Sequence, residues 1–146
     1  MTITFKDRYF TIDGKIRGKK LNLIMKVFQR KHINTRTIPV TVPILNKHLP
    51  VIFTCDCFND KNCSFEEECK HTELGHLFEH IMLEYLCMAK IADGKNEAIY
   101  EGITSWNWLK EKEGTFNIEI TSGLKDEKFI KKALNQSTDL LSKILS

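Results

Sequence analysis

The sequence predicts an α+β fold, with a small mixed or antiparallel sheet packed against a buried central helix and a C-terminal amphipathic helix. Three observations support this prediction. Residues 19–30 and 115–121 alternate apolar and polar side chains, which is the two-residue period of a half-buried strand. Residues 72–92 carry the strongest helical pattern in the chain, and residues 126–145 carry a second one. A chain of 146 residues suits a single domain, here 1–146.

The N-terminal part predicts two strands, over residues 2–12 and 19–30. Between them, Asp13-Gly14 is a residue pair typical of hairpin turns. Ile24 and Phe28 interrupt the alternation and would also fit a helix. We favour a strand, because the alternating apolar residues are Leu21, Leu23, Met25 and Val27.

Proline and capping residues delimit the middle of the chain. Pro43 is compatible with the first turn of a short helix over residues 42–47, which Pro50 would end. Residues 55–63 are turn-rich and predict a loop, after which Ser64–Glu67 has the form of a capping box. Residues 95–114 predict no definite element.

Two helices and one strand complete the prediction. The helix over residues 72–92 ends at Asp93-Gly94, because glycine is a common helix terminator. Residues 115–121 form the last strand. The final helix, over residues 126–145, has as its apolar residues Phe129, Ile130, Ala133, Leu134, Leu140, Leu141 and Ile144.

Composition excludes several classes of protein. The net charge of +3, with both signs interspersed, is too small to indicate nucleic-acid binding. No apolar run approaches the roughly 20 residues that span a membrane, and the N-terminus does not resemble a secretory signal, so we expect a cytoplasmic protein. An odd count of five cysteines argues against a disulfide framework. A homo-oligomer remains compatible with the sequence.

The helix over residues 72–92 is apolar nearly all round, which predicts a buried helix. Its polar residues fall on one stripe, and charged groups buried there need partners. One solution is a divalent metal ion, because two histidines one helical turn apart can bind one zinc ion. The stripe consists of His76, Glu79, His80, Glu84 and Cys87.

The order His76-Leu77-Phe78-Glu79-His80 is the H-x-x-E-H order of inverted zinc peptidases. It predicts His76 and His80 as zinc ligands and Glu79 as a general base. Glu84 lies about 12 Å along the helix from His76, so we expect it to orient His80 from outside the coordination sphere. The structural alternative is that no metal ion is bound and that the carboxylates of Glu79 and Glu84 are hydrogen-bond partners of the histidines.

The remaining cysteines and carboxylates leave the third metal ligand open. The candidates are Cys57, Cys55, Glu101 and Glu119. A separate cysteine-based zinc site is an alternative, although its spacing lacks the C-x2-C pairs of typical sites; it would use Cys55, Cys57, Cys63, Cys69 and His71. Ordinary reduced thiols are the other interpretation, with Cys87 in the core.

The segment Gly75–Glu84 resembles the G-H-x-x-E-H-x-x-L-E segment in the N-terminal domain of cyanophycin synthetases. Looser similarities, resting on order and spacing, are Leu49-Pro50, Cys55-Asp56-Cys57, Gly102-Ile103-Thr104 and Gly114–Ile120. The resemblance implies an α+β domain that holds a polymer of aspartate and arginine. In some members this motif carries a metal-hydrolase site. The residues that carry over are His76, Glu79, His80, Glu84 and Cys57.

The chain also departs from that family. It has no room for an ATP-grasp or ligase domain and no Gly-rich phosphate loop, so synthetase activity is not expected. The family's His-His pair before Cys57 is missing, and Ser105-Trp106 replaces an arginine.

Three hypotheses for the function follow. The first is a zinc-dependent (or other divalent-metal) hydrolase of a peptide or isopeptide bond, acting on a peptide or polyamino-acid substrate. The second is a non-catalytic module that binds a polymer or a protein, with the motif helix as a structural core. The third is a metal-storing or metal-sensing protein that uses its thiols.

Overall fold

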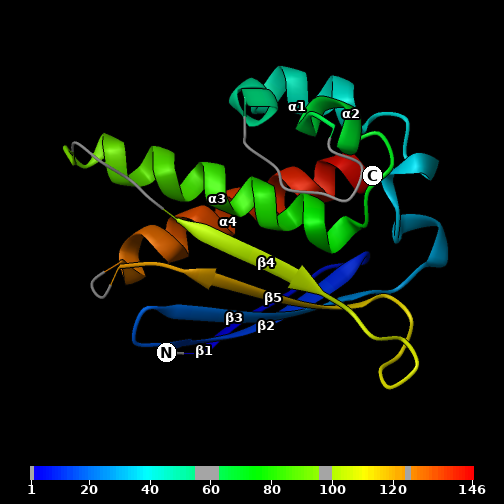
Figure 1. Ribbon diagram of the computed structural model, residues 1–146, viewed down its shortest axis with the longest axis horizontal. Coiled ribbons are helices and arrows are strands. Elements are labelled where there is room, and N and C mark those ends of the chain that lie inside the picture. Colours follow the sequence, from blue (N-terminus) through cyan, green and yellow to red (C-terminus); the bar gives the residue numbers. More distant parts are fainter. Residues whose placement is uncertain (1, 55–62, 96–99, 124–125) are drawn as a thin grey trace.

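The computed structural model describes residues 2–54, 63–95, 100–123 and 126–146. They form one antiparallel five-stranded sheet with all the helices on one side of it (Figure 1). The strand order is β1-β2-β3-β5-β4, and the α+β class predicted from the sequence is confirmed. The strands are β1 (Thr2–Lys6), β2 (Phe10–Arg17), β3 (Lys20–Val27), β4 (Glu101–Ser105) and β5 (Thr115–Thr121).

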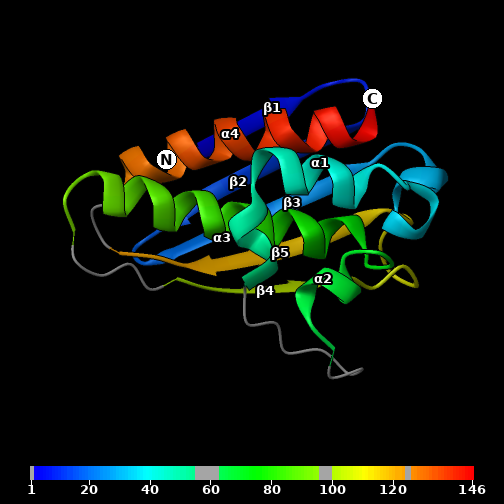
Figure 2. The ribbon, with the colours of Figure 1, turned by 90° about the horizontal axis from the view of Figure 1, so that it is seen from above.

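The helices build a second layer over the sheet. Seen from above, α3 and α4 run side by side over the sheet, α1 lies over these two helices, and α2 lies beside α3 on the side of β4 (Figure 2). The α-helices are α1 (Thr41–His48), α2 (Phe65–Glu68), α3 (Leu74–Ala92) and α4 (Glu127–Leu145). Short 3₁₀ turns occupy Arg30–His32, Thr35–Thr37 and Pro50–Thr54.

The turn predicted at Asp13-Gly14 is wrong, because both residues lie inside β2, where Gly14 pairs with Leu23 of β3. The actual two-residue turn is Gly18-Lys19, with Gly18 at φ 59°. The inward-facing side of β2 continues through Phe10, Ile12 and Ile16, and a Cβ on Gly14 would lie 2.4 Å from Leu23 Cδ2. Long-range strand pairing therefore overrides the local turn preference of Asp-Gly.

The first predicted strand is in fact two. Asp7 Oδ1 accepts hydrogen bonds from the backbone N–H groups of Tyr9 (2.7 Å) and Phe10 (3.0 Å), which closes the turn between β1 and β2. The strand prediction for residues 19–30 is confirmed as β3, ending at Val27. Ile24 and Phe28, the two residues that interrupted the alternation, are 41% and 49% exposed.

The other element predictions are confirmed to within a few residues. The predicted short helix is α1, the predicted C-terminal strand is β5, and the last helix is α4. Ser64 caps α2 by accepting a hydrogen bond from the Glu67 N–H at 3.3 Å, as its capping-box sequence predicts. Gly94, at φ 85°, follows the end of α3. No element was predicted over residues 95–114, where the structure has the strand β4.

The N-terminal turn of α3 lies unusually close to the sheet. A Cβ on Gly75 would lie 2.4 Å from Cγ of the fully buried Phe116 on β5. Only glycine therefore allows this turn to approach the strand so closely. The consequence is that the polar residues that follow on α3 come to lie directly above β4 and β5.

Gly75→Ala should destabilise the protein by about 1–2 kcal/mol, because overpacking against Phe116 outweighs the helix propensity of alanine. Urea denaturation at pH 7.5 would measure it. Met88→Ala, at a 47% exposed position of the same helix, is the control and should change the free energy of unfolding by less than about 0.5 kcal/mol. A Gly75→Ala protein as stable as the wild type would contradict the close packing.

Candidate metal centre

Three side chains of α3 bring metal-binding atoms together. One ligand atom each from His76, Glu79 and His80 lies within 4.8 Å of the other two. Within the described ranges of the chain, no other three His, Cys, Asp or Glu residues form such a group. The grouping follows from helix geometry, because residues three and four apart lie on one face.

The spacing of the two imidazoles fits a shared ion. His76 Nε2 and His80 Nε2 lie 3.1 Å apart. Two nitrogens bound tetrahedrally to one zinc ion at about 2.0–2.1 Å would lie roughly 3.3 Å apart. Imidazole nitrogens are donors that suit zinc, and the Glu79 carboxylate lies beside them. The residues present therefore fit the metal ion that the sequence predicts.

Phe65 of α2 holds the imidazoles in place. Its ring stacks on His80 with centroids 4.2 Å apart and meets His76 edge-on at 6.2 Å. Phe65 is fully buried, and the Ser64 cap fixes the start of its helix. The site is thus assembled from α3 and the short α2, two elements whose relation the sequence did not predict.

Glu79 points from α3 onto β4. Its side chain is almost fully buried, and Oε1 accepts a hydrogen bond of 2.7 Å from Thr104 Oγ1. A Cβ on Gly102 would lie 2.8 Å from Glu79 Cγ, so the missing side chain at Gly102 makes room for the carboxylate. Glu79 Oε2 lies 4.0 Å from His80 Nε2.

Burial changes the protonation of both residues. It raises the pKa of Glu79, although the Thr104 hydrogen bond and the nearby His76 oppose that rise. Burial, followed by repulsion from His76, lowers the pKa of His80 to about 3. His80 is therefore neutral at physiological pH, which is the form that binds metals.

A polar chain leads away from His76. His76 Nδ1 lies 2.8 Å from Thr72 Oγ1, and Thr72 Oγ1 donates to Glu68 Oε1 at 3.4 Å. Glu68 and Thr72 are both buried, at 8% and 0% exposure. Neither residue was predicted from the sequence. The available signal was their spacing, because Glu68, Thr72, His76 and His80 follow one another every four residues.

Two of the predicted candidates for the third ligand are wrong. Gly102 and Thr104 face α3, so Glu101 on the same strand faces away from it and is exposed. Glu119 pairs with Ile103 across the sheet and, on that same outer face, forms an ion pair of 3.1 Å with Lys20. The two-residue period of a strand thus places both carboxylates on the opposite face from the donor group.

The roles predicted for the other candidate residues stay predictions. Cys55 and Cys57 lie outside the described residues. His80 Nδ1 has no hydrogen-bond partner in the described part of the chain, so Glu84 does not bond to it there. The orienting role of Glu84 is therefore not seen at that atom.

The described cysteines do not gather into a zinc site of their own. Cys63 Sγ donates to Glu68 Oε2 at 3.5 Å, and Cys69 Sγ donates to the Glu66 carbonyl at 3.2 Å. Burial raises the pKa of the Cys69 thiol to about 11, which disfavours the thiolate that binds metals. Cys87 is half-buried rather than in the core.

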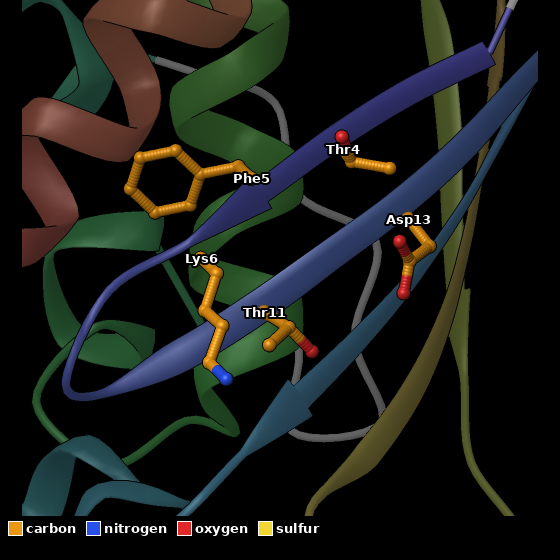
Figure 3. Close-up of a pocket in the computed structure, with 5 residues that line it drawn as sticks. All are labelled: Thr4, Phe5, Lys6, Thr11 and Asp13. Atoms are coloured by element: carbon orange, nitrogen blue, oxygen red, sulfur yellow. The ribbon is translucent and has the colours of Figure 1, made fainter.

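A surface hollow lies on another part of the sheet. Figure 3 shows it on β1 and β2, where Lys6 and Thr11 are register partners and the Phe5 ring points toward the helices. Its lining residues, Thr4, Phe5, Lys6, Thr11 and Asp13, include none of the donor group.

Among the described residues, no helix is long and apolar enough to cross a membrane.

No protein-family profile matches the chain, and no curated protein matches it significantly. Only the residues of the site itself therefore bear on its function.

Thr104→Val should remove the hydrogen bond to Glu79 and leave a buried carboxylate oxygen without its donor. We expect a loss of about 1–3 kcal/mol in the free energy of unfolding at pH 8, and a further rise in the pKa of Glu79. Urea denaturation of the metal-free protein would measure it. Ser105→Ala, on the exposed face of β4, is the control. Equal effects of the two substitutions would contradict the Thr104–Glu79 interaction.

The metal-free protein should lose stability as the pH falls below about 6.5, because unfolded His80 then binds a proton that folded His80 rejects until about pH 3. Between pH 7 and pH 5, the protonation of unfolded His80 alone should lower the free energy of unfolding by about 2 kcal/mol. The raised pKa of Glu79 acts in the opposite direction, since it lowers stability as the pH rises above about 4.5.

His80→Gln removes the first contribution and keeps the second. The measurement is urea denaturation at both pH values, after chelator treatment. The variant should have a flatter dependence of stability on pH than the wild type. Identical slopes would show that His80 is not buried in its neutral form.

Proposed function

We propose that this protein is a metal-dependent hydrolase of a peptide or isopeptide bond, with His76 and His80 as zinc ligands and Glu79 as general base. The observation that carries the proposal is the convergence of two imidazoles and one carboxylate, within 4.8 Å, on a largely buried stripe of α3. Burying these groups is costly, and a divalent cation is a partner that compensates all three.

Each residue of the proposed site has a defined role. A zinc ion held there would supply Lewis acidity toward a carbonyl oxygen and lower the pKa of water. Thr104 holds Glu79 Oε1, which turns Oε2 toward the histidines. Glu79 takes a proton from the attacking water and returns it to the leaving amine. A pKa raised by burial brings Glu79 closer to the working pH of such a base.

The substrate class is supported by two features of the sequence. The H-x-x-E-H order over His76–His80 is that of inverted zinc peptidases, which cleave peptide bonds. The segment Gly75–Glu84 resembles the N-terminal domain of cyanophycin synthetases, and in some members of that family a metal site on this motif cuts a polymer of aspartate and arginine. We therefore propose a peptide or a polyamino acid as the substrate, and Cys57 as a third ligand.

Elemental analysis of protein purified without a metal-affinity tag should find about one zinc ion per chain. His76→Ala and His80→Ala should each abolish zinc binding, because one remaining imidazole is not enough to hold the ion at this site. Glu127→Gln, an exposed position on α4, is the control and should keep it. Metal-free wild-type protein that remains folded would contradict the proposal.

Glu79→Gln should keep the zinc but lower turnover by about 10²–10⁴-fold, the usual contribution of a general base. Release of amino groups from casein-derived peptides, and from poly-aspartate bearing arginine through isopeptide bonds, would measure turnover. A zinc-loaded wild type that cleaves neither substrate would favour the binding-module hypothesis. An unchanged rate in Glu79→Gln would exclude Glu79 as the base.

A further inference from the structure

We propose that Glu68 and Thr72 are positioning residues of this centre, which fix His76 as its Nδ1–H tautomer and so prepare Nε2 to bind the metal ion. The proposal rests on the metal site of the proposed function and extends it to two residues outside the donor group. Their action is indirect, because neither Glu68 nor Thr72 belongs to the group of converging ligand atoms.

The four side chains form one continuous line of hydrogen-bonding groups. Glu68 Oε1 lies 3.4 Å from Thr72 Oγ1, which lies 2.8 Å from His76 Nδ1, and His76 Nε2 lies 3.1 Å from His80 Nε2. The line crosses the junction between α2 and α3, because Glu68 ends the first helix and Thr72 precedes the second. Thr72 is fixed there, since its N–H donates to Thr35 Oγ1 at 2.9 Å.

Counting protons gives the line a direction. A hydroxyl group has one proton, and the Glu68 carboxylate can only accept, so Thr72 donates to Glu68. Thr72 Oγ1 must then accept from His76, which places a proton on His76 Nδ1. Glu68 Oε1 lies 4.0 Å from that nitrogen and attracts the same proton. His76 Nε2 is left without a proton, as a metal ligand must be.

The fourth residue supports the same direction. With His76 Nε2 as an acceptor, His80 Nε2 must carry the proton of their 3.1 Å hydrogen bond. His80 Nδ1 is then an unprotonated nitrogen, which agrees with its lack of a hydrogen-bond partner among the described residues. The reverse direction would bury an N–H donor at that atom without an acceptor, and such orphaned donors are rare in proteins.

The two ligands therefore differ in their readiness for metal. His76 already presents a lone pair at Nε2, whereas His80 carries its proton on the nitrogen that faces the site. To bind through Nε2, His80 must lose that proton and, as a neutral ring, take one up at Nδ1. Metal binding must then offset the cost of a proton at a nitrogen that has no acceptor among the described residues. Zinc binding should thus leave the tautomer of His76 unchanged and change that of His80.

Long-range ¹H–¹⁵N correlation spectra of histidine-labelled full-length protein would test the proposal, with the metal removed by a chelator and the pH at 8.5, about two units above the ordinary pKa of an imidazole. The expected wild-type spectrum shows His76 protonated at Nδ1 and His80 protonated at Nε2. Adding zinc should move only the His80 proton. Observation of His76 protonated at Nε2 in the metal-free wild type would overturn the proposal without any substitution.

Substitutions at Thr72 connect the tautomer to metal binding. Thr72→Val should reduce the Nδ1–H population of His76 and weaken zinc binding by about 10–100-fold, the usual cost of losing a partner of a metal-bound histidine. Thr72→Ser, which keeps the hydroxyl, should restore both. Thr138→Val, which removes a buried hydroxyl bonded to the Leu134 carbonyl of α4, is the matched control and should alter neither. Zinc affinity is measured by competition with a chromophoric chelator.

The outcomes separate this proposal from the proposed function. A wild type that shows the expected tautomer but does not bind zinc would contradict the proposed function and leave the orienting interaction in place. A wild type that binds zinc, with a Thr72→Val variant of unchanged affinity and tautomer, would overturn the orienting role alone.

Discussion

The close approach of α3 to the sheet is the constraint on which the rest of this structure depends. It is possible because two contact points lack side chains, Gly75 against Phe116 and Gly102 against Glu79. With a larger residue at either point, the helix or its carboxylate would have to move. Glu79 consequently lies against Gly102 and Thr104 of β4, and both Glu79 and His80 are only 5% exposed to water.

Excluding water makes each polar group on the stripe depend on its neighbours. Thr104 satisfies one oxygen of Glu79, and Thr72 and the two imidazoles satisfy one another. In this low-dielectric setting burial favours uncharged forms, so the pKa of Glu79 rises and that of His80 falls. The burial that makes the metal-free site costly also keeps His80 neutral, the form that can bind a metal ion, and raises the pKa of Glu79, the residue proposed as the general base.

The junction between α2 and α3 gives the site its second support. Phe65 stacks on His80, and Glu68 reaches His76 through Thr72. These contacts come from a short helix of four residues, which would not be stable by itself. Its stability must come from the burial of Phe65 and Cys69 and from the Ser64 cap. The orientation of the imidazoles therefore depends on packing between two elements.

The sequence by itself determined the local features of this protein. The period of side chains along 72–92, the cap at Ser64 and the alternation of 115–121 are set by neighbouring residues, and helix geometry alone groups His76, Glu79 and His80. Only the tertiary structure decided what depends on distant pairing. Pairing between strands places Asp13-Gly14 within β2 and puts Glu101 and Glu119 on the outer face of the sheet. The packing of α3 places Thr104 and Glu68 beside the donor group. The physical reason is that pairing with neighbouring strands fixes the register of a strand and the side of the sheet on which each of its side chains lies. In a helix, by contrast, the spacing of residues in the sequence already decides which side chains share a face.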